Sequence, residues 1–156
     1  MSNKDRKHKL DKSSTATLNF VDASGKDFTI NLVQALSISD ATIENDMANQ
    51  PALYVWWASI LERAKLRLKQ AQDNEEYTRS LLAAEIRKEN PKITVAALSD
   101  ALMLSEDYRE AREDIRYWEG EVGILSYVVK AFEQRKDMLV QKSAQLRKTM
   151  NNENLR

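Results

Sequence analysis

The segment YREAREDIRYWEGEVGILSYVVKAFEQRKDMLVQKSAQL, residues 108–146, decides the fold of this chain. Steps of alternately three and four residues from Tyr108 reach twelve positions, of which ten are apolar. This spacing lines apolar side chains along one side of an α-helix, and its persistence over about five heptads is typical of a coiled coil. The pattern predicts an unbroken helix from a Thr94 cap to about residue 148.

A second long helix is predicted upstream, over residues 51–88. The same stepping from Tyr54 to Glu85 finds seven apolar positions out of ten. Pro51 fits the first turn of this helix, where a missing N–H costs nothing. Pro91 ends it, because the residue before a proline is disfavoured in the α region. The two long helices are expected to pair as an antiparallel hairpin or coiled coil.

The sequence before these helices changes its period. A short helix capped by Asp40 and ending near Ala48 is predicted first. Further upstream, apolar and polar residues alternate at 15–21 and at 28–33, around a Ser24–Gly25 turn, which predicts a β-hairpin. The expected fold class is therefore all-α, with a small N-terminal β-hairpin.

The apolar stripes also predict self-association. A helix of about 54 residues would be more than about 75 Å long, so the helix at 51–88 cannot cover its whole stripe. A homo-oligomer would cover the rest. Gly120 and Gly123 are expected to mark close approach of another helix beside Trp118, with a functional kink as the alternative. The residues predicted for the core or for contacts between copies are Trp57, Ile115, Trp118, Val122, Leu125, Phe132 and Leu139.

The composition predicts a protein that is not an enzyme and uses no cofactor. The absence of cysteine removes disulfides, thiolate catalysis and Cys-ligated zinc. The only histidine is His8, in a basic N-terminal segment, and the three glycines are isolated, so no phosphate-binding loop is present. No apolar run approaches the roughly 18 residues of a membrane span, and no secretory signal is recognisable. These features predict a cytoplasmic protein without membrane contact.

The net charge of zero conceals an uneven distribution. Residues 1–12 carry a net +3, residues 13–129 a net −7, and residues 130–156 a net +4. Basic ends on an acidic middle can attract an acidic partner such as nucleic acid, or the middles of neighbouring copies.

Basic residues recur along the predicted first long helix. Arg63 and Arg67 are four residues apart on one face, and Lys65 and Lys69 lie on a neighbouring one. Spacing alone leaves two interpretations open: a solvated face with i, i+4 ion pairs, or an anion-binding surface that repeats around an oligomer. A line at Arg109, Arg112 and Arg116 is flanked by acidic residues and is expected to matter less. The candidate nucleic-acid-binding residues are Arg63, Arg67, Lys69, Arg87, Lys88 and Lys92.

Three stretches of the chain resemble the UvsY-like recombination mediators of phages. They are YVWWASILERAKLRLKQAQ, KITVAALSDALMLSEDY and ILSYVVKAFEQRKDMLVQ, within about residues 50–150. The resemblance implies a ring-like helical homo-oligomer that binds single-stranded DNA. It also implies help in loading a RecA-like recombinase onto strands covered by single-strand-binding protein. The family's basic cluster late in its first long helix is matched most nearly by Arg87 and Lys88, with the run at 63–69 upstream.

The alternative function is a structural coiled-coil protein, such as a phage assembly factor or adaptor, that binds no nucleic acid. Under either function the expected organisation is a disordered basic tail at 1–13, the β-hairpin at 14–36, a helical domain for oligomerisation and DNA binding at 37–150, and a disordered tail at 151–156.

Overall fold

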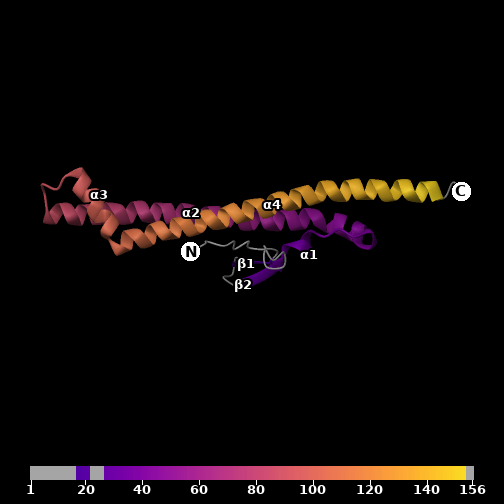
Figure 1. Ribbon diagram of the computed structural model, residues 1–156, viewed down its shortest axis with the longest axis horizontal. Coiled ribbons are helices and arrows are strands. Elements are labelled where there is room, and N and C mark those ends of the chain that lie inside the picture. Colours follow the sequence, from indigo (N-terminus) through magenta and orange to yellow (C-terminus); the bar gives the residue numbers. More distant parts are fainter. Residues whose placement is uncertain (1–16, 22–26, 154–156) are drawn as a thin grey trace, which may run out of the picture. The chain divides into compact units, whose positions relative to one another are not determined.

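A computed structural model describes residues 17–21 and 27–153 of the chain. In chain order the elements are β1 (Thr17–Val21), β2 (Asp27–Asn31), α1 (Leu32–Leu36), the 3-10 helix η1 (Asp40–Thr42), α2 (Ile43–Glu89), α3 (Val95–Leu104) and α4 (Glu106–Glu153) (Figure 1). The predicted all-α fold, with two long helices packed antiparallel and a small N-terminal β-hairpin, is confirmed.

The chain divides into two compact units. The first unit contains residues 1–51 and 131–156, and the second contains residues 52–130. Each unit therefore includes one part of α2 and one part of α4, and the region 37–150 contributes to both. The predicted tail at 1–13 lies outside the described residues. The predicted disordered tail at 151–156 is wrong for residues 151–153, because α4 continues to Glu153; residues 154–156 lie outside the described residues.

The β-hairpin of the first unit has the register that the alternation of apolar residues implies. Phe20 lies opposite Phe28, with 5.5 Å between the ring centroids, and Leu18 lies opposite Ile30. Phe20 is buried. The predicted turn at 24–25 lies outside the described residues. The second strand ends at Asn31 rather than at residue 33, since the Asn31 side chain accepts a hydrogen bond from the Gln34 amide and begins α1.

The predicted interruption of the helix before Pro51 is wrong. The η1 turn begins after Ser39, so Asp40 lies in its first turn and is not the cap. The following helix, α2, runs through Pro51 without a break. A proline in a helix interior costs about 3 kcal/mol. Contacts of the two preceding turns offset this cost, because Asp46 and the buried Gln50 are both bound to the C-terminal part of α4.

The first unit pairs α2 and α4 in opposite directions. Asp40 contacts Lys142, Asp46 contacts Arg135, and Gln50 contacts Phe132. As one chain number rises the other falls, which is the pattern of antiparallel packing. Phe132 and Leu139 are each 1% exposed and form the apolar part of this contact.

The second unit has an apolar core along the predicted stripes. Trp57, Leu61, Ala64 and Ala71 are buried on α2, and Tyr108, Ala111 and Leu125 are buried on α4, together with Val128, which is next to the predicted stripe position Val129. At the far end of the unit, Leu98, Leu102 and Tyr108 form a cluster against Leu82, Ala83, Ile86 and Ile93. Thr94 caps α3 as predicted, since its hydroxyl accepts a hydrogen bond from the Ala97 amide at 3.2 Å.

The predicted unbroken helix from residue 95 to 148 is interrupted at Ser105. Ser105 is extended, ends α3, and donates its amide to the Leu102 carbonyl at 3.1 Å. Its own carbonyl accepts from Arg109 and starts α4. Glu106 and Asp107 then occupy the first turn, where negative charge stabilises the positive end of the helix dipole. The sequence Ser-Glu-Asp is an N-terminal helix signal that is independent of the apolar stripe.

Candidate nucleic-acid interface

The six candidate basic residues are all exposed, but they do not lie on one face. Arg63, Arg67, Lys69, Arg87 and Lys88 project from α2, and Lys92 lies in the turn that follows it. At about 100° per residue, Arg63, Arg67 and Lys88 fall on one flank of α2, whereas Lys69 and Arg87 fall on the other. The structure thus divides the predicted cluster into two sets.

The first set belongs to a continuous row, which we call the 63–88 row. Steps of alternately four and three residues define it, and all of its positions are exposed and none is acidic. Its polar members are two arginines, two side-chain amides, a tyrosine and a terminal lysine. The row consists of Arg63, Arg67, Gln70, Asn74, Tyr77, Leu81, Ala84 and Lys88.

The basic residues of this row keep their charge available. Within the described part of the chain, Arg63, Arg67 and Lys88 form no ion pair. Tyr77 is 63% exposed, so its ring is accessible on the same side of the helix. Cations that bind phosphate and an aromatic face that stacks on bases are the two components of a single-strand binding surface.

The opposite flank of α2 differs because its lysines are paired with carboxylates. Lys65 contacts Glu62 at 2.8 Å, and Lys69 contacts Asp73 at 2.8 Å. The hydrogen bond from Lys69 to Asp73, together with the charge of that carboxylate, raises the pKa of the lysine. These pairs reduce the positive field that a phosphate would meet on this flank.

An acidic groove borders the middle of the row. It is an open depression of about 600 Å³ in the second unit, between Asn74 and Thr78 of α2 and the first turns of α4. Its acidic lining residues are Asp107, Glu110, Glu113 and Asp114. A phosphate would be repelled here, so phosphate contacts are expected at the two ends of the row, at Arg63 and Arg67 and at Lys88.

The arginine line on α4 is partly occupied by contacts within the second unit. Arg112 lies over the Tyr108 ring, 6.0 Å from its centroid, and donates to the Met103 sulfur. Arg116 contacts Glu113 at 3.6 Å. The hydrogen bond between Glu75 and Tyr108, followed by burial, raises the pKa of the tyrosine. These contacts agree with a structural role for this line.

The predicted core residues lie on the packed sides of the helices. Trp57, Leu125, Phe132 and Leu139 are buried. Ile115, Trp118 and Val122 are half-buried. Among residues 17–21 and 27–153, the close approach predicted at Gly120 and Gly123 is absent, since a Cβ added at either glycine would meet none of their atoms within 4 Å.

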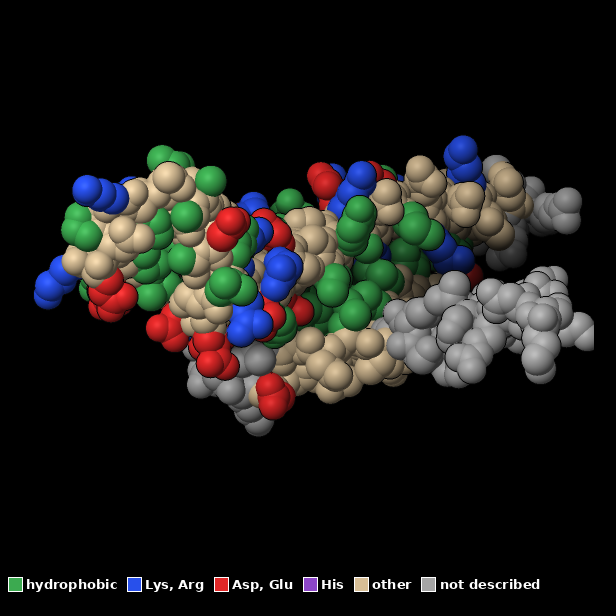
Figure 2. Space-filling view, turned by 60° about the vertical axis from the view of Figure 1, so that its left-hand side comes forward, with side chains coloured by type: hydrophobic (Ala, Val, Ile, Leu, Met, Phe, Trp, Pro, Cys, Tyr) green, Lys and Arg blue, Asp and Glu red, His purple; other side chains and the backbone are tan. Residues whose placement is uncertain are grey.

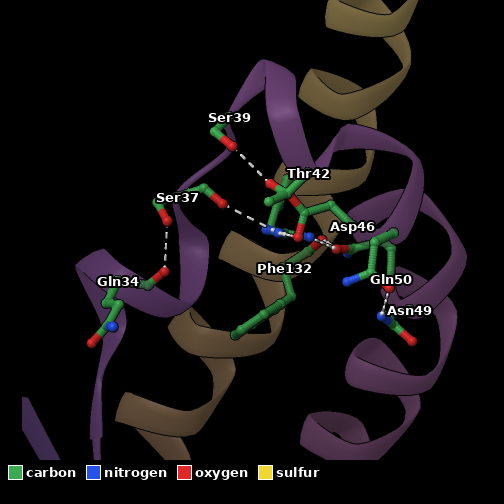
Figure 3. Close-up of polar contacts among 10 residues, drawn as sticks. Gln34, Ser37, Ser39, Thr42, Asp46, Asn49, Gln50 and Phe132 are labelled. Carbon is green, nitrogen blue, oxygen red and sulfur yellow. Dashed lines mark hydrogen bonds and ion pairs between the residues drawn. The ribbon is translucent and has the colours of Figure 1, made fainter.

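A buried polar cluster in the first unit was not expected from the sequence. Arg135, only 4% exposed, donates to Gln50 at 2.6 Å, to the Asp46 carboxylate at 2.9 Å and to the Ser37 carbonyl at 3.2 Å. Gln50 in turn donates to the Phe132 carbonyl. Figure 3 shows Ser37, Asp46 and Gln50 converging beside Phe132. The cluster joins the connection after α1 to both long helices and is a structural clamp.

Hydrogen bonding also perturbs the carboxylate in this cluster. Thr42 donates to Asp46 at 2.8 Å. This bond, with the hydrogen bond and charge of Arg135, lowers the pKa of Asp46 and outweighs partial burial. The signal for the cluster was present in the sequence, because Arg135 is three residues after Phe132 and four before Leu139 and therefore shares their side of the helix.

The class of protein defined by these features is a helical hairpin with an exposed basic row. No family model, curated protein or solved structure matches the chain. Among residues 17–21 and 27–153, no group of His, Cys, Asp or Glu side chains could hold a metal ion. In the same residues, no helix is both long enough and apolar enough to cross a bilayer.

Proposed function

We propose that this protein is a non-catalytic homo-oligomer that binds single-stranded DNA along the 63–88 row. The observation that carries the proposal is the composition of that row: eight exposed positions over seven turns of α2, with three cations that pair with no described carboxylate, an exposed tyrosine and no acid. The opposite flank of the same helix lacks this combination.

The proposed mechanism combines phosphate contacts with base stacking. Arg63 and Arg67 bind the backbone at one end of the row, and Lys88 binds it at the other. Between them, the backbone turns away from the acidic groove and a base stacks on Tyr77. Such stacking contributes about 1–3 kcal/mol per base and tolerates any sequence. Repetition of the row in an oligomer adds these modest contacts together.

The proposed cellular role is that of a recombination mediator. The resemblance to the UvsY-like family supports this role, with a RecA-like recombinase and single-strand-binding protein as partners. In this role, the row would hold the strand extended while the recombinase replaces single-strand-binding protein. The assay for this part is recombinase-dependent strand exchange on covered DNA, with and without the protein.

The binding proposal is tested by fluorescence anisotropy with labelled oligo-dT. The informative variant is R63E/R67E/K88E, and its matched control is K65E/K69E/R87E, which makes the same charge change on the other flank of α2. We expect the first to weaken binding by about tenfold or more and the second to weaken it much less. Equal losses in both variants would mean that overall charge, and not the row, determines binding.

A structural coiled-coil protein without nucleic-acid binding is the second candidate. The acidic groove beside Asn74 and the exposed apolar residues of both long helices favour it. Wild-type protein that shows no oligo-dT binding at about 50 mM salt would exclude the first function and favour this second one.

A further inference from the structure

The outer face of α4, which is turned away from its packed side, carries a second apolar stripe that begins at Tyr117, on the rim of the acidic groove. Steps of three and four residues connect Tyr117, Gly120, Ile124 and Tyr127, and the same spacing reaches Met138 further along the helix. Tyr117 is 56%, Ile124 42%, Tyr127 77% and Met138 59% exposed. In the view of Figure 2, apolar side chains lie at the surface among charged side chains of both signs. Water-exposed tyrosines in register along one helix are typical of a protein contact surface.

Two glycines lie on or beside this stripe, and no described residue packs against them. A Cβ at Gly120 or Gly123 would meet no atom within 4 Å. Each glycine weakens the helix by about 1 kcal/mol relative to alanine. Without side chains at these two positions, a second helix can approach the α4 backbone closely.

The charge of α4 identifies the kind of helix that fits. Residues 106–129 contain seven acidic and three basic side chains, a net of −4. Residues 130–153 contain three acidic and six basic side chains, a net of +3. A second α4 running in the opposite direction places the acidic half of each helix on the basic half of the other. A parallel copy would place like charges together.

The register follows from the same residues. We infer that two copies of this chain pair antiparallel through the outer faces of α4, with the two-fold axis close to Tyr127. This inference rests on the homo-oligomeric part of the proposed function and is independent of DNA binding. In this register, Tyr117 of one copy lies opposite Met138 of the other.

The charged residues that flank the stripe agree with this register. Arg116 of one copy lies opposite Asp137 of the other. Arg116 and Asp137 have side chains that are 64% and 66% exposed, so both can reach a partner. In this register the two helices overlap from Glu106 to about residue 148, about 65 Å by about 10 Å, which buries roughly 1,300 Å² in total and is enough for a stable dimer.

Single-cysteine variants test the pairing directly, because the protein has no cysteine of its own. A short bis-maleimide should cross-link Tyr127→Cys to itself. Tyr117→Cys alone should not cross-link, since its two copies would be about 30 Å apart. A mixture of Tyr117→Cys and Met138→Cys should give the heterodimer. Cross-linking of Tyr117→Cys to itself would instead establish parallel pairing and overturn the inference.

Charge exchange provides a second, independent measurement. By light scattering, Arg116→Glu should shift the dimer toward the 17.9 kDa monomer, and addition of Asp137→Arg should restore the dimer. A wild-type monomer at micromolar concentration would overturn the inference. Oligo-dT binding by a protein that forms no α4 dimer would refute this interface alone, whereas a dimer that binds no DNA would refute only the DNA-binding proposal.

Discussion

The two compact units use different means to join the same pair of helices. In the second unit, α2 and α4 meet through apolar side chains such as Trp57 and Leu125. In the first unit, a buried arginine with three hydrogen-bond acceptors lies between Phe132 and Leu139. The difference shows that a coiled-coil stripe can contain a specific polar contact. The proposed DNA-binding surface also belongs to one unit only, because the 63–88 row lies in the second unit.

The largest expected effects are at the fully covered aromatic residues, one in each unit. Trp57 is 0% and Phe132 is 1% exposed, so Trp57→Ala and Phe132→Ala should each lower the free energy of unfolding by about 3–5 kcal/mol. Trp118→Ala should cost clearly less, because this residue is only half-buried. Urea unfolding followed by circular dichroism measures all three. Equal costs at Trp118 and Trp57 would contradict the burial described for this stripe.

The next largest effect on the free energy of unfolding is expected at the arginine clamp, the buried cluster around Arg135. Arg135→Ala leaves Asp46 and Gln50 without their shared partner, and we expect a loss of about 3 kcal/mol. The adjacent Lys136, whose side chain is 62% exposed, provides the control, and Lys136→Ala should change stability by less than about 0.5 kcal/mol. If the two alanine variants unfold at the same urea concentration, the clamp does not stabilise the first unit.

The apolar contacts between the helices could be predicted from the sequence, but the polar cluster of the first unit could not. The apolar repeat identified Trp57, Leu125 and Phe132, because burial of apolar residues repeats with the helical period. The spacing of Arg135 from Phe132 and Leu139 places it on the packed side of the helix, but an arginine on a charged helix is usually solvated, and the acceptors that bury it lie about 90 residues away in the chain. The continuity of α2 through Pro51 could not be predicted for the same reason, because contacts with residues distant in the chain offset the local cost of the proline.

The candidate interface was predictable only in part. The sequence supplied the basic residues, but it did not show which of them are neutralised. Lys69 and Arg67 look equivalent by spacing, yet Lys69 is bound to Asp73 and Arg67 is not bound to any described carboxylate. The two flanks of α2 can be distinguished only when the positions of the core residues and of the neighbouring acidic side chains are known.

A smaller effect is expected at Tyr108 in the second unit. Tyr108→Phe removes the hydrogen bond with Glu75 and should cost about 1 kcal/mol at neutral pH. Because the pKa of Tyr108 is raised in the folded state, its contribution is present below pH 10 and is lost as the pH rises above that value. Comparison of the wild type and Tyr108→Phe between pH 8 and about pH 11 tests this: the difference should narrow at high pH.

The smallest effect concerns the acid sensitivity of the first unit. The pKa of Asp46 is lowered in the folded state, so its contribution is present above the ordinary value of 3.8 and is lost as the pH falls below it. Asp46→Asn should therefore be destabilised at neutral pH and should lose less stability than the wild type on acidification. Glu133→Gln, at an exposed carboxylate of the same unit, is the control. An unchanged acid profile in Asp46→Asn would exclude this linkage.

The comparison of the two flanks of α2 is tested most directly by the salt dependence of oligo-dT binding. Each phosphate neutralised on a single strand contributes about −0.7 to the slope of log affinity against log salt concentration. If Arg63, Arg67 and Lys88 each contact one phosphate per chain, R63E/R67E/K88E should make the slope shallower by about 2. The control K65E/K69E/R87E should retain the wild-type slope. A wild-type slope in the first variant, or an equal change in both, would contradict the assignment of DNA binding to the 63–88 row.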